Sequence, residues 1–220
     1  MNEISSEALK KNGPTDPEAV GVLAGMGQRF LAFCGRFGGH FRQRTRTVET
    51  AAQQYVQGLI QAETKNMERM EEVVPDADHQ GLQHMLSESA WSERAVLDQV
   101  AQEASQRLGN NEDTSLTIDE SGFPKKGGHS VGVARQWCGQ IGKVDNCQVG
   151  VFAALSRGSD VTLIDERLFL PKDWTDDAAR CEAVGIPKAH RGFQRKADLA
   201  LDLIRHARQH GIGFAWVGFD

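Results

Sequence analysis

The hydrophobic pattern of this 220-residue chain changes its period near residue 112. Before that point, apolar residues recur every three or four positions, as on one face of a helix. After it they alternate at every second position, as in a half-buried strand. We therefore expect a mobile tail at residues 1–18, a helical region at 19–111 and a strand-containing α/β domain at 112–220.

The helical region carries two apolar stripes with a break between them. The first stripe consists of Val48, Ala51, Ala52, Tyr55, Val56, Leu59 and Ile60. The second consists of Leu97, Val100, Ala101, Ala104 and Leu108, followed by the stop signal Gly109-Asn110. Pro75 breaks the chain between the stripes, and a short helix is expected around Leu82 and Met85. The pattern predicts a small helical bundle.

The second region predicts three strands, a helix and a fourth strand. The strands are expected at 116–119, 147–155 and 161–170, with the first three forming an antiparallel meander. The helix has Ala200, Leu203, Ile204 and Ala207 on one face. The last strand, 214–220, is a nearly continuous apolar run, which is typical of a strand covered on both faces. The predicted order is β-β-β-α-β.

Two of these strand patterns close with an aspartate, Asp119 in the first and Asp220 in the last. Mg²⁺ takes hard oxygen ligands and is held by one or two protein carboxylates together with substrate phosphates and water. We expect both carboxylates at the ends of adjacent strands, near enough to share one ion. Glu120 should point to the opposite face of its strand. Taken singly, each aspartate also fits a solvated turn residue.

Basic residues gather at two places in the chain. Five arginines and no acid lie between residues 29 and 46, with four phenylalanines among them. The candidates for contact with DNA phosphates are Arg36, Arg42, Arg44 and Arg46 in this cluster, and Lys125, Lys126 and Arg135 after the first acid. Solvated surface charge is the alternative reading of both groups.

Two acidic stretches have structural interpretations. Asp165-Glu166-Arg167 fits the charged face of a hairpin, and Asp173, Asp176 and Asp177 around Trp174 fit helix caps. A zinc set of His129, Cys138 and Cys147 is a less favoured alternative, because the four cysteines form no CxxC pair and are expected as reduced thiols.

Charge and hydropathy argue against two classes of protein, those that coat nucleic acid and those that span a membrane. The net charge of -5 argues against a protein that coats nucleic acid along its whole surface. No apolar run approaches the ~18 residues of a membrane span, and the first residues contain no apolar signal-peptide segment. We therefore expect a cytoplasmic protein that does not bind membranes.

Four stretches of the second region resemble the DDE superfamily endonuclease domain of bacterial insertion-sequence transposases, which has a ribonuclease H-like fold. They are the stretches from Ile118 to Gly127, from Ser130 to Gly139, from Gly142 to Phe152 and from Leu168 to Trp174. Upstream, Tyr55-Val56-Gln57-Gly58-Leu59, Lys65-Asn66, Leu82-Gln83 and Trp91 are similar to the helical N-terminal region of that group. The likeness begins at about residue 29.

This resemblance implies DNA transposition and recombination, with metal-dependent cleavage and strand transfer of double-stranded DNA at element ends. Asp119 and Asp220 would be the first and second acids of a triad that binds Mg²⁺, or Mn²⁺ in its place. The third acid, a Glu on a later helix, has no position in these 220 residues. We therefore expect a ribonuclease H-like domain that is incomplete at its C-terminus and a partial or inactive fragment. The protein would be associated with the nucleoid when bound to DNA.

Two other functions stay open. One is a transposase remnant that binds DNA or self-associates, for example as a homo-oligomer, without performing chemistry. The other is a different carboxylate-dependent hydrolase in which Asp119 and Asp220 act as an acid/base pair. We rank this hydrolase last, because no substrate-pocket signature accompanies the two acids.

Overall fold

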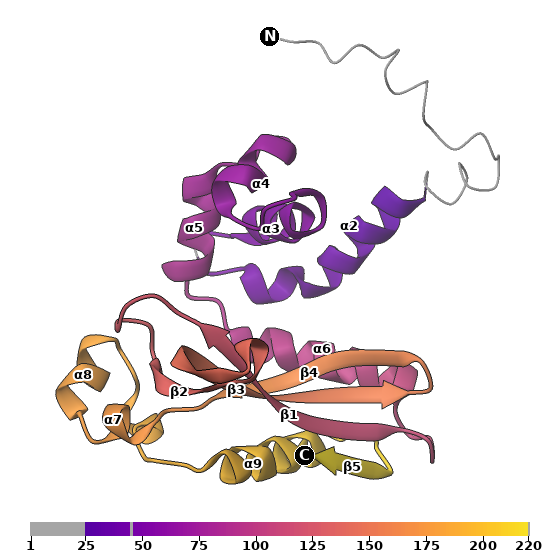
Figure 1. The fold of residues 1–220 in the computed structure, drawn as a ribbon. Helices are drawn as coiled ribbons and strands as arrows, with labels where there is room; N and C mark the ends of the chain where they lie inside the picture. Colours follow the sequence, from indigo (N-terminus) through magenta and orange to yellow (C-terminus); the bar gives the residue numbers. More distant parts are fainter. Residues whose placement is uncertain (1–24, 45, 220) are drawn as a thin grey trace. The chain divides into compact units, whose positions relative to one another are not determined.

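The computed structural model describes residues 25–44 and 46–219 (Figure 1). The chain forms two compact units that divide between Glu93 and Arg94. The tail expected at residues 1–18 and the second acid, Asp220, lie outside the described residues. Within the described part of the chain, no helix combines the length and the apolar character needed to cross a membrane.

The first unit is helical, as its sequence pattern predicted. Its elements are α2 (Met26–Phe37), the 3-10 turn η1 (Gly38–Phe41), α3 (Glu49–Gln61), α4 (Met67–Val73) and α5 (His79–Ser87). Two small apolar clusters hold the helices together. One contains Val48, Ala52 and Met85, and the other contains Ala62, Met70 and Leu82. The helix α3 contributes to the cores through the stripe that the sequence predicted.

Several residues that carry the family resemblance in this unit determine helix packing. A side chain at Gly58 would come within 3 Å of Met70, so the glycine allows α3 and α4 to approach closely. The side chain of Asn66 caps the first turn of α4, accepting a backbone hydrogen bond of 2.9 Å. The indole Nε1 of Trp91 donates to the Met85 carbonyl at 2.7 Å. These motif positions are therefore explained by the fold of the unit.

The second unit is a mixed sheet with helices. Its elements are α6 (Glu93–Leu108), β1 (Ser115–Pro124), β2 (Ala134–Cys138), η2 (Gly139–Ile141), β3 (Lys143–Arg157), β4 (Asp160–Leu168), α7 (Lys172–Thr175), α8 (Ala178–Ala183), η3 (Lys188–His190), α9 (Lys196–Gln209) and β5 (Trp216–Phe219). β1 pairs with β3 and β3 with β4, both antiparallel, and β5 joins β1 in parallel.

The sequence β1, β3, β4, α9, β5 is the predicted β-β-β-α-β order, and the fold is ribonuclease H-like. The antiparallel meander and the helix before the last strand are confirmed. β2 is a short additional strand, paired with the start of β3. Its sequence, Ala-Arg-Gln-Trp-Cys, has too little apolar alternation to have been predicted as a strand.

One face of the sheet is covered by α6 and α9. The buried cluster on this face contains Leu116, Ile118, Val151, Ala153, Leu155 and Ile164 from the strands, and Ala101, Ala104, Leu108, Leu199, Leu203 and Ala207 from the two helices. The apolar stripes of both helices were visible in the sequence. The packing shows that α6, which the sequence pattern grouped with the helical region, belongs to the core of the sheet.

Two expectations about strand ends were wrong. Asp119 does not close its strand, because β1 continues to Pro124 and pairs with β3 along its whole length. The last strand is not covered on both faces, because β5 pairs only with β1 among the described strands and its side chains are exposed. Trp216 is 66 % and Phe219 75 % exposed.

The interpretation of Asp165 as part of a solvated hairpin face was also wrong. A β-bulge in the β3–β4 pairing shifts the register at Ala153 and Ala154, so that Ile164 and Asp165 are both buried. Asp165 is only 5 % exposed. Its carboxylate Oδ1 accepts from Arg94 Nη1 at 2.6 Å and Arg167 Nη1 at 2.8 Å. The arginines hold the pKa of Asp165 below its usual range, against the opposing effect of burial.

The helix α9 offers a direct test of this core. Leu203 is fully buried under the sheet, whereas Leu201 on the same helix is 47 % exposed. We expect Leu203→Ala to lower the free energy of unfolding by about 2–5 kcal/mol, because the substitution removes buried apolar contacts and leaves a cavity. Leu201→Ala is the matched control and should cost less than about 1 kcal/mol. Urea denaturation followed by circular dichroism measures both, and equal losses would contradict the assignment of the buried face.

Candidate functional site

Asp119 lies in the middle of β1 with its side chain exposed. Its Oδ1 accepts a hydrogen bond of 2.7 Å from the backbone N–H of Glu120. No lysine, arginine or histidine forms an ion pair with it among the residues that the structure describes. The oxygens of this carboxylate are the hard ligands that Mg²⁺ and Mn²⁺ prefer. This donor fits a divalent ion of the expected kind.

Glu120 points to the opposite side of the strand, as the alternation of β1 predicts. Its Oε2 lies 2.7 Å from Nζ of Lys196, in the first turn of α9. In the β1–β3 register Glu120 is opposite Val151, which belongs to the core under α9. The two neighbouring acids are thus separated: Glu120 is paired on the helix-covered face, and Asp119 faces away from it.

A hollow of about 370 Å³ lies beside Asp119, between the strands and the start of α9. It is lined by Ile118, Asp119, Glu120, Val151, Lys196, Ala197, Ala200, Leu201, Ile204 and Phe219. Its walls are largely apolar, and its charged groups are the Lys196–Glu120 pair and the carboxylate of Asp119. The hollow is therefore a neighbour of the acid rather than a polar binding site of its own.

The register of β5 shows which residue of the last strand lies beside the residue before Asp119. β5 pairs with β1 in parallel, from Ser115 with Trp216 to Ile118 with Phe219. The structure thus brings the residue before Asp119 beside Phe219, the last described residue of β5. Asp220 itself lies outside the described residues, so its distance from Asp119 stays a prediction.

The second basic group, Lys125, Lys126 and Arg135, meets at one end of the sheet. The side-chain amide of Asn146 donates to the carbonyls of Lys125 and Gly127, both at 2.8 Å, and so fixes the loop that follows β1. Asn146 is also the partner of Arg135 in the β2–β3 register. All three basic side chains are exposed.

One acid lies close to this group. Asp145 pairs with Lys143 at 3.0 Å, and its Oδ1 accepts from the backbone N–H of Asn146 at 2.8 Å. That hydrogen bond, followed by the contacts with Lys143, lowers the pKa of Asp145 from its ordinary value. The carboxylate is therefore ionised at neutral pH, and its principal partner is Lys143.

The arginine cluster of the first unit is less uniform than its sequence suggested. The guanidinium of Arg36 lies over the Phe33 ring, 5.0 Å from its centroid. Arg42 Nε forms an ion pair of 2.9 Å with Glu49, an acid outside the acid-free stretch. Arg44 and Arg46 are exposed on the turn between η1 and α3. The structure thus neutralises Arg42 in part and leaves Arg44 and Arg46 on the surface.

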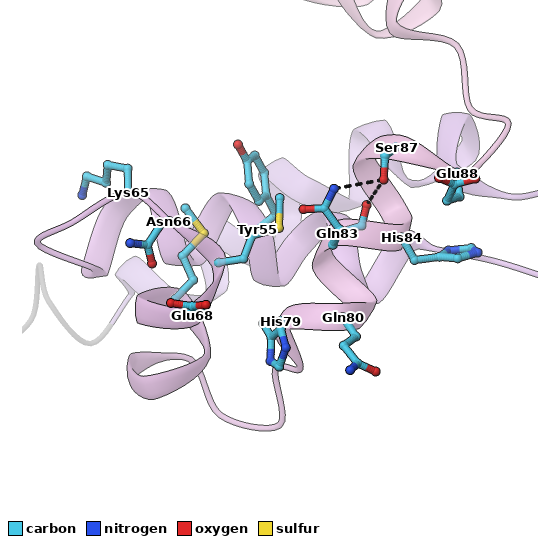
Figure 2. A pocket seen from close by; sticks show the side chains of 12 residues that line it. Tyr55, Lys65, Asn66, Glu68, His79, Gln80, Gln83, His84, Ser87 and Glu88 are labelled. Atoms are coloured by element: carbon cyan, nitrogen blue, oxygen red, sulfur yellow. Dashed lines mark hydrogen bonds between the residues drawn. The ribbon is translucent and has the colours of Figure 1, made fainter. Parts of the chain in front are cut away.

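A larger hollow, of about 790 Å³, lies in the first unit (Figure 2). It brings together Tyr55, Lys65, Asn66 and Gln83, four residues of the stretches that resemble the family. None of the four candidate arginines of this unit lines it. Lys65 Nζ donates to the Ala62 carbonyl and Asn66 caps α4, so two of the four have structural roles.

The remaining sequence candidates have clear outcomes. Asp177 caps α8, accepting from the backbone N–H of Arg180 at 2.8 Å, as the helix-cap interpretation predicted. His129 is exposed, whereas Cys138 and Cys147 are buried.

Two groups of potential metal ligands occur among the described residues. In each, three ligand atoms lie within 4.8 Å of one another. One group is Asp98, His206 and His210, and the other is Glu71, Asp78 and His79. Neither was predicted, although the spacing of His206 and His210 is a detectable signal for half of the first group.

The second unit is thus a ribonuclease H-like domain whose first strand carries an exposed acid. A family model described as DDE superfamily endonuclease matches residues 36–220, and the chain belongs to this family. The family implies a DNA substrate and a divalent metal. No curated protein and no solved structure matched the chain in the same comparisons.

Proposed function

We propose that this chain is a DDE transposase of an insertion sequence, which cleaves and joins double-stranded DNA at the element's ends. The parallel register of β1 and β5, which pairs Ile118 with Phe219, is the observation that carries the proposal. The next residue on each side is an aspartate, Asp119 and Asp220. Continued pairing by one residue would set the two carboxylates on neighbouring strands, which lie about 4.8 Å apart.

In this proposal Asp119 and Asp220 hold the metal ions, Mg²⁺ or Mn²⁺. When bound, such ions activate water or a DNA 3′-hydroxyl for attack on a phosphodiester and stabilise the departing oxygen. The two carboxylates repel each other, and a divalent cation between them relieves this repulsion. The ion pair of Lys196 with Glu120 supports the choice of Asp119 as the metal ligand, because it engages the neighbouring acid, Glu120, and leaves Asp119 for the metal.

Two groups of basic residues would bind the DNA backbone. Lys125 and Lys126 follow the strand that carries Asp119, and Arg135 lies on β2 opposite Asn146, which holds the Lys125 carbonyl, so the three suit phosphates of the DNA backbone near the cleaved bond. The arginines 36, 42, 44 and 46 would supply contacts from the helical unit, with Arg44 and Arg46 the most accessible. Phosphate contacts of this kind give affinity without sequence specificity.

The alternative function is a DNA-binding or self-associating transposase remnant without cleavage activity. The exposed apolar side chains of Trp216 and Phe219 on β5 favour it, because an edge strand of this kind can pair with another chain. The two functions differ in one measurable property, which is metal-dependent nicking.

Cleavage by Asp119 and Asp220 without a third acid predicts that the chain nicks supercoiled plasmid DNA carrying the element's ends in the presence of Mg²⁺ or Mn²⁺. The inactive fragment that the missing third acid led us to expect would leave the plasmid intact. Asp119→Asn should lower the nicking rate by at least about 100-fold, because it removes a charged metal ligand while keeping the shape of the side chain. Glu120→Gln is the matched control, since it changes the adjacent acid on the other face of β1. Gel electrophoresis of nicked and supercoiled plasmid measures both rates.

Two outcomes would overturn the cleavage proposal. One is the absence of nicking by the unchanged chain with either metal, which would leave the non-catalytic alternative. The other is nicking that survives in Asp119→Asn and is lost in Glu120→Gln, which would move the metal to the helix-covered face.

A second prediction concerns the arginines of the helical unit. The double variant Arg44→Ala/Arg46→Ala should weaken DNA binding and reduce the slope of log K against log salt by about two, because each phosphate contact contributes roughly 0.9 to that slope. Arg42→Ala should have a smaller effect, since Glu49 already pairs with this arginine. Fluorescence anisotropy of labelled duplex DNA across a salt series measures the slopes.

The control for this series is Arg69→Ala, which removes an exposed arginine that is paired with Glu72 in α4. It should leave the slope unchanged. An unchanged slope in the double variant as well would assign Arg44 and Arg46 to solvated surface.

A further inference from the structure

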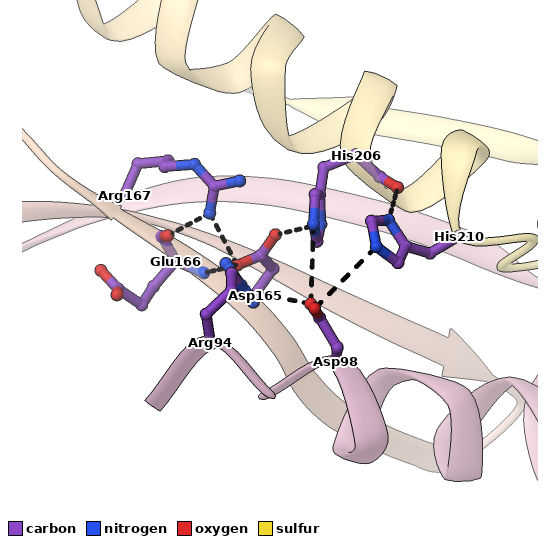
Figure 3. A network of polar contacts seen from close by, with 7 residues as sticks. All are labelled: Arg94, Asp98, Asp165, Glu166, Arg167, His206 and His210. Atoms are coloured by element: carbon purple, nitrogen blue, oxygen red, sulfur yellow. Dashed lines mark hydrogen bonds and ion pairs between the residues drawn. The ribbon is translucent and has the colours of Figure 1, made fainter. Parts of the chain in front are cut away.

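A second set of metal-ligating side chains lies where α6 meets α9 (Figure 3). Asp98 comes from α6, His206 lies in the last turn of α9, and His210 is the C-cap residue that follows this helix. The imidazole centroids are 4.0 Å apart, and one ligand atom from each of the three residues lies within 4.8 Å of the others. The side chains are 22–36 % exposed, so the cluster is open to ions from solvent.

The two histidines face Asp98 with the same ring nitrogen. Nδ1 of His206 lies 2.9 Å from Oδ2 of Asp165, and Nδ1 of His210 lies 2.9 Å from the His206 carbonyl oxygen. The hydrogen bond at Nδ1 of His210 places the proton of a neutral imidazole there and leaves a lone pair on Nε2. The contact of His206 with Asp165 has an ion-pair distance without hydrogen-bond geometry. Figure 3 shows that both Nε2 atoms are directed toward the carboxylate of Asp98.

The separations in this cluster suit ligands around a metal better than hydrogen bonds. Nε2 of His206 lies 3.6 Å from Oδ1 of Asp98, and Nε2 of His210 lies 3.9 Å from Oδ2. Direct hydrogen bonds between such atoms span about 2.7–3.2 Å. Two ligands at about 2.0–2.1 Å from a tetrahedral zinc ion are roughly 3.3 Å apart. A small contraction would therefore place all three groups around one ion.

Asp98 has unused capacity for a ligand. Its Oδ1 is buried and accepts no hydrogen bond from a described residue, although Arg94 Nε approaches it to 3.0 Å as an ion pair. The charge of Arg94 already compensates this carboxylate in part, and the remaining lone pairs of Asp98 are open to a metal ion. This oxygen is the one nearest to His206 Nε2.

The surroundings of His206 resemble the support that metal-bound histidines receive. Histidine ligands usually direct their other ring nitrogen to a carboxylate, which fixes the ring and raises its basicity. Asp165 has that position here, and Arg94 and Arg167 hold its carboxylate in turn. The contact with the Asp165 carboxylate therefore favours this position of the His206 ring in the absence of an ion.

We propose that Asp98, His206 and His210 form a binding site for a borderline transition-metal ion such as Zn²⁺. Two imidazole nitrogens and one carboxylate favour such an ion over Mg²⁺, which prefers oxygen ligands and octahedral geometry. Water would take the fourth position, because the cluster is partly exposed. A bound ion would join α6 to α9, so the site stabilises the helix layer over the sheet. It is independent of Asp119, because the two sites share no ligand.

The experiment uses the full chain, freed of metal by a chelator and then held in excess Mg²⁺ so that oxygen-ligand sites are filled. We expect calorimetric titration with ZnCl₂ to give one site. We expect Co²⁺ to give visible absorption bands of a four-coordinate nitrogen and oxygen complex. His210→Ala and Asp98→Asn should each weaken Zn²⁺ binding at least about tenfold. Zn²⁺ should raise the melting temperature of the unchanged chain and not that of His210→Ala.

His79→Ala is the matched control, because it removes a histidine from the other cluster of this kind, Glu71, Asp78 and His79. It should leave Zn²⁺ affinity unchanged. Two results would overturn the proposal. One is Zn²⁺ binding that survives in both His210→Ala and Asp98→Asn and is lost in His79→Ala, which would assign the ion to the first unit. The other is no Zn²⁺ binding by the unchanged chain.

Discussion

The parallel pairing of β5 with β1 is the constraint on which the rest of the second unit depends. Parallel neighbours cannot be joined by a tight turn, so the chain must cross the sheet between them, and α9 makes part of this crossing. The crossing helix needs an apolar surface to pack on, and the inward residues of β1, β3 and β4 supply it. Helices therefore cover one face of the sheet, and the exposed side chain of Asp119 alternates to the opposite face of β1.

The sequence predicted the parts of this arrangement that rest on periodicity. The alternating residues of β3 and the stripe of Leu203 and Ala207 on α9 carry strong signals, because burial on one face imposes a fixed period. The end of β1 carries no such signal. Gly122 resembles a strand terminator, yet it lies inside β1, where a side chain would come within about 3.0 Å of Cys138. β1 therefore continues past Asp119, which lies in the middle of the strand. The hydrophobic pattern gives no signal for this close packing.

Other features depended on partners that are distant in sequence. The bulge that buries Asp165 changes the phase of β4 by one residue, so a residue expected on the solvent side joins the core side. Arg94, 71 residues away, then becomes its partner. In the same way, Glu49 neutralises Arg42 from outside the acid-free stretch. Local composition predicted the cluster of arginines, but only the fold shows which of them has a counterion.

The helix α9 contacts acidic residues at both of its ends within the second unit. Near its start, Lys196 holds Glu120, the residue adjacent to Asp119. Near its end, His206 and His210 face Asp98 across the contact with α6. Both sets depend on the same buried stripe, because Leu199, Leu203 and Ala207 fix the height and rotation of the helix over the sheet. A displacement of α9 would therefore change the pairing of Glu120 and the histidine cluster together, even though the two groups share no ligand.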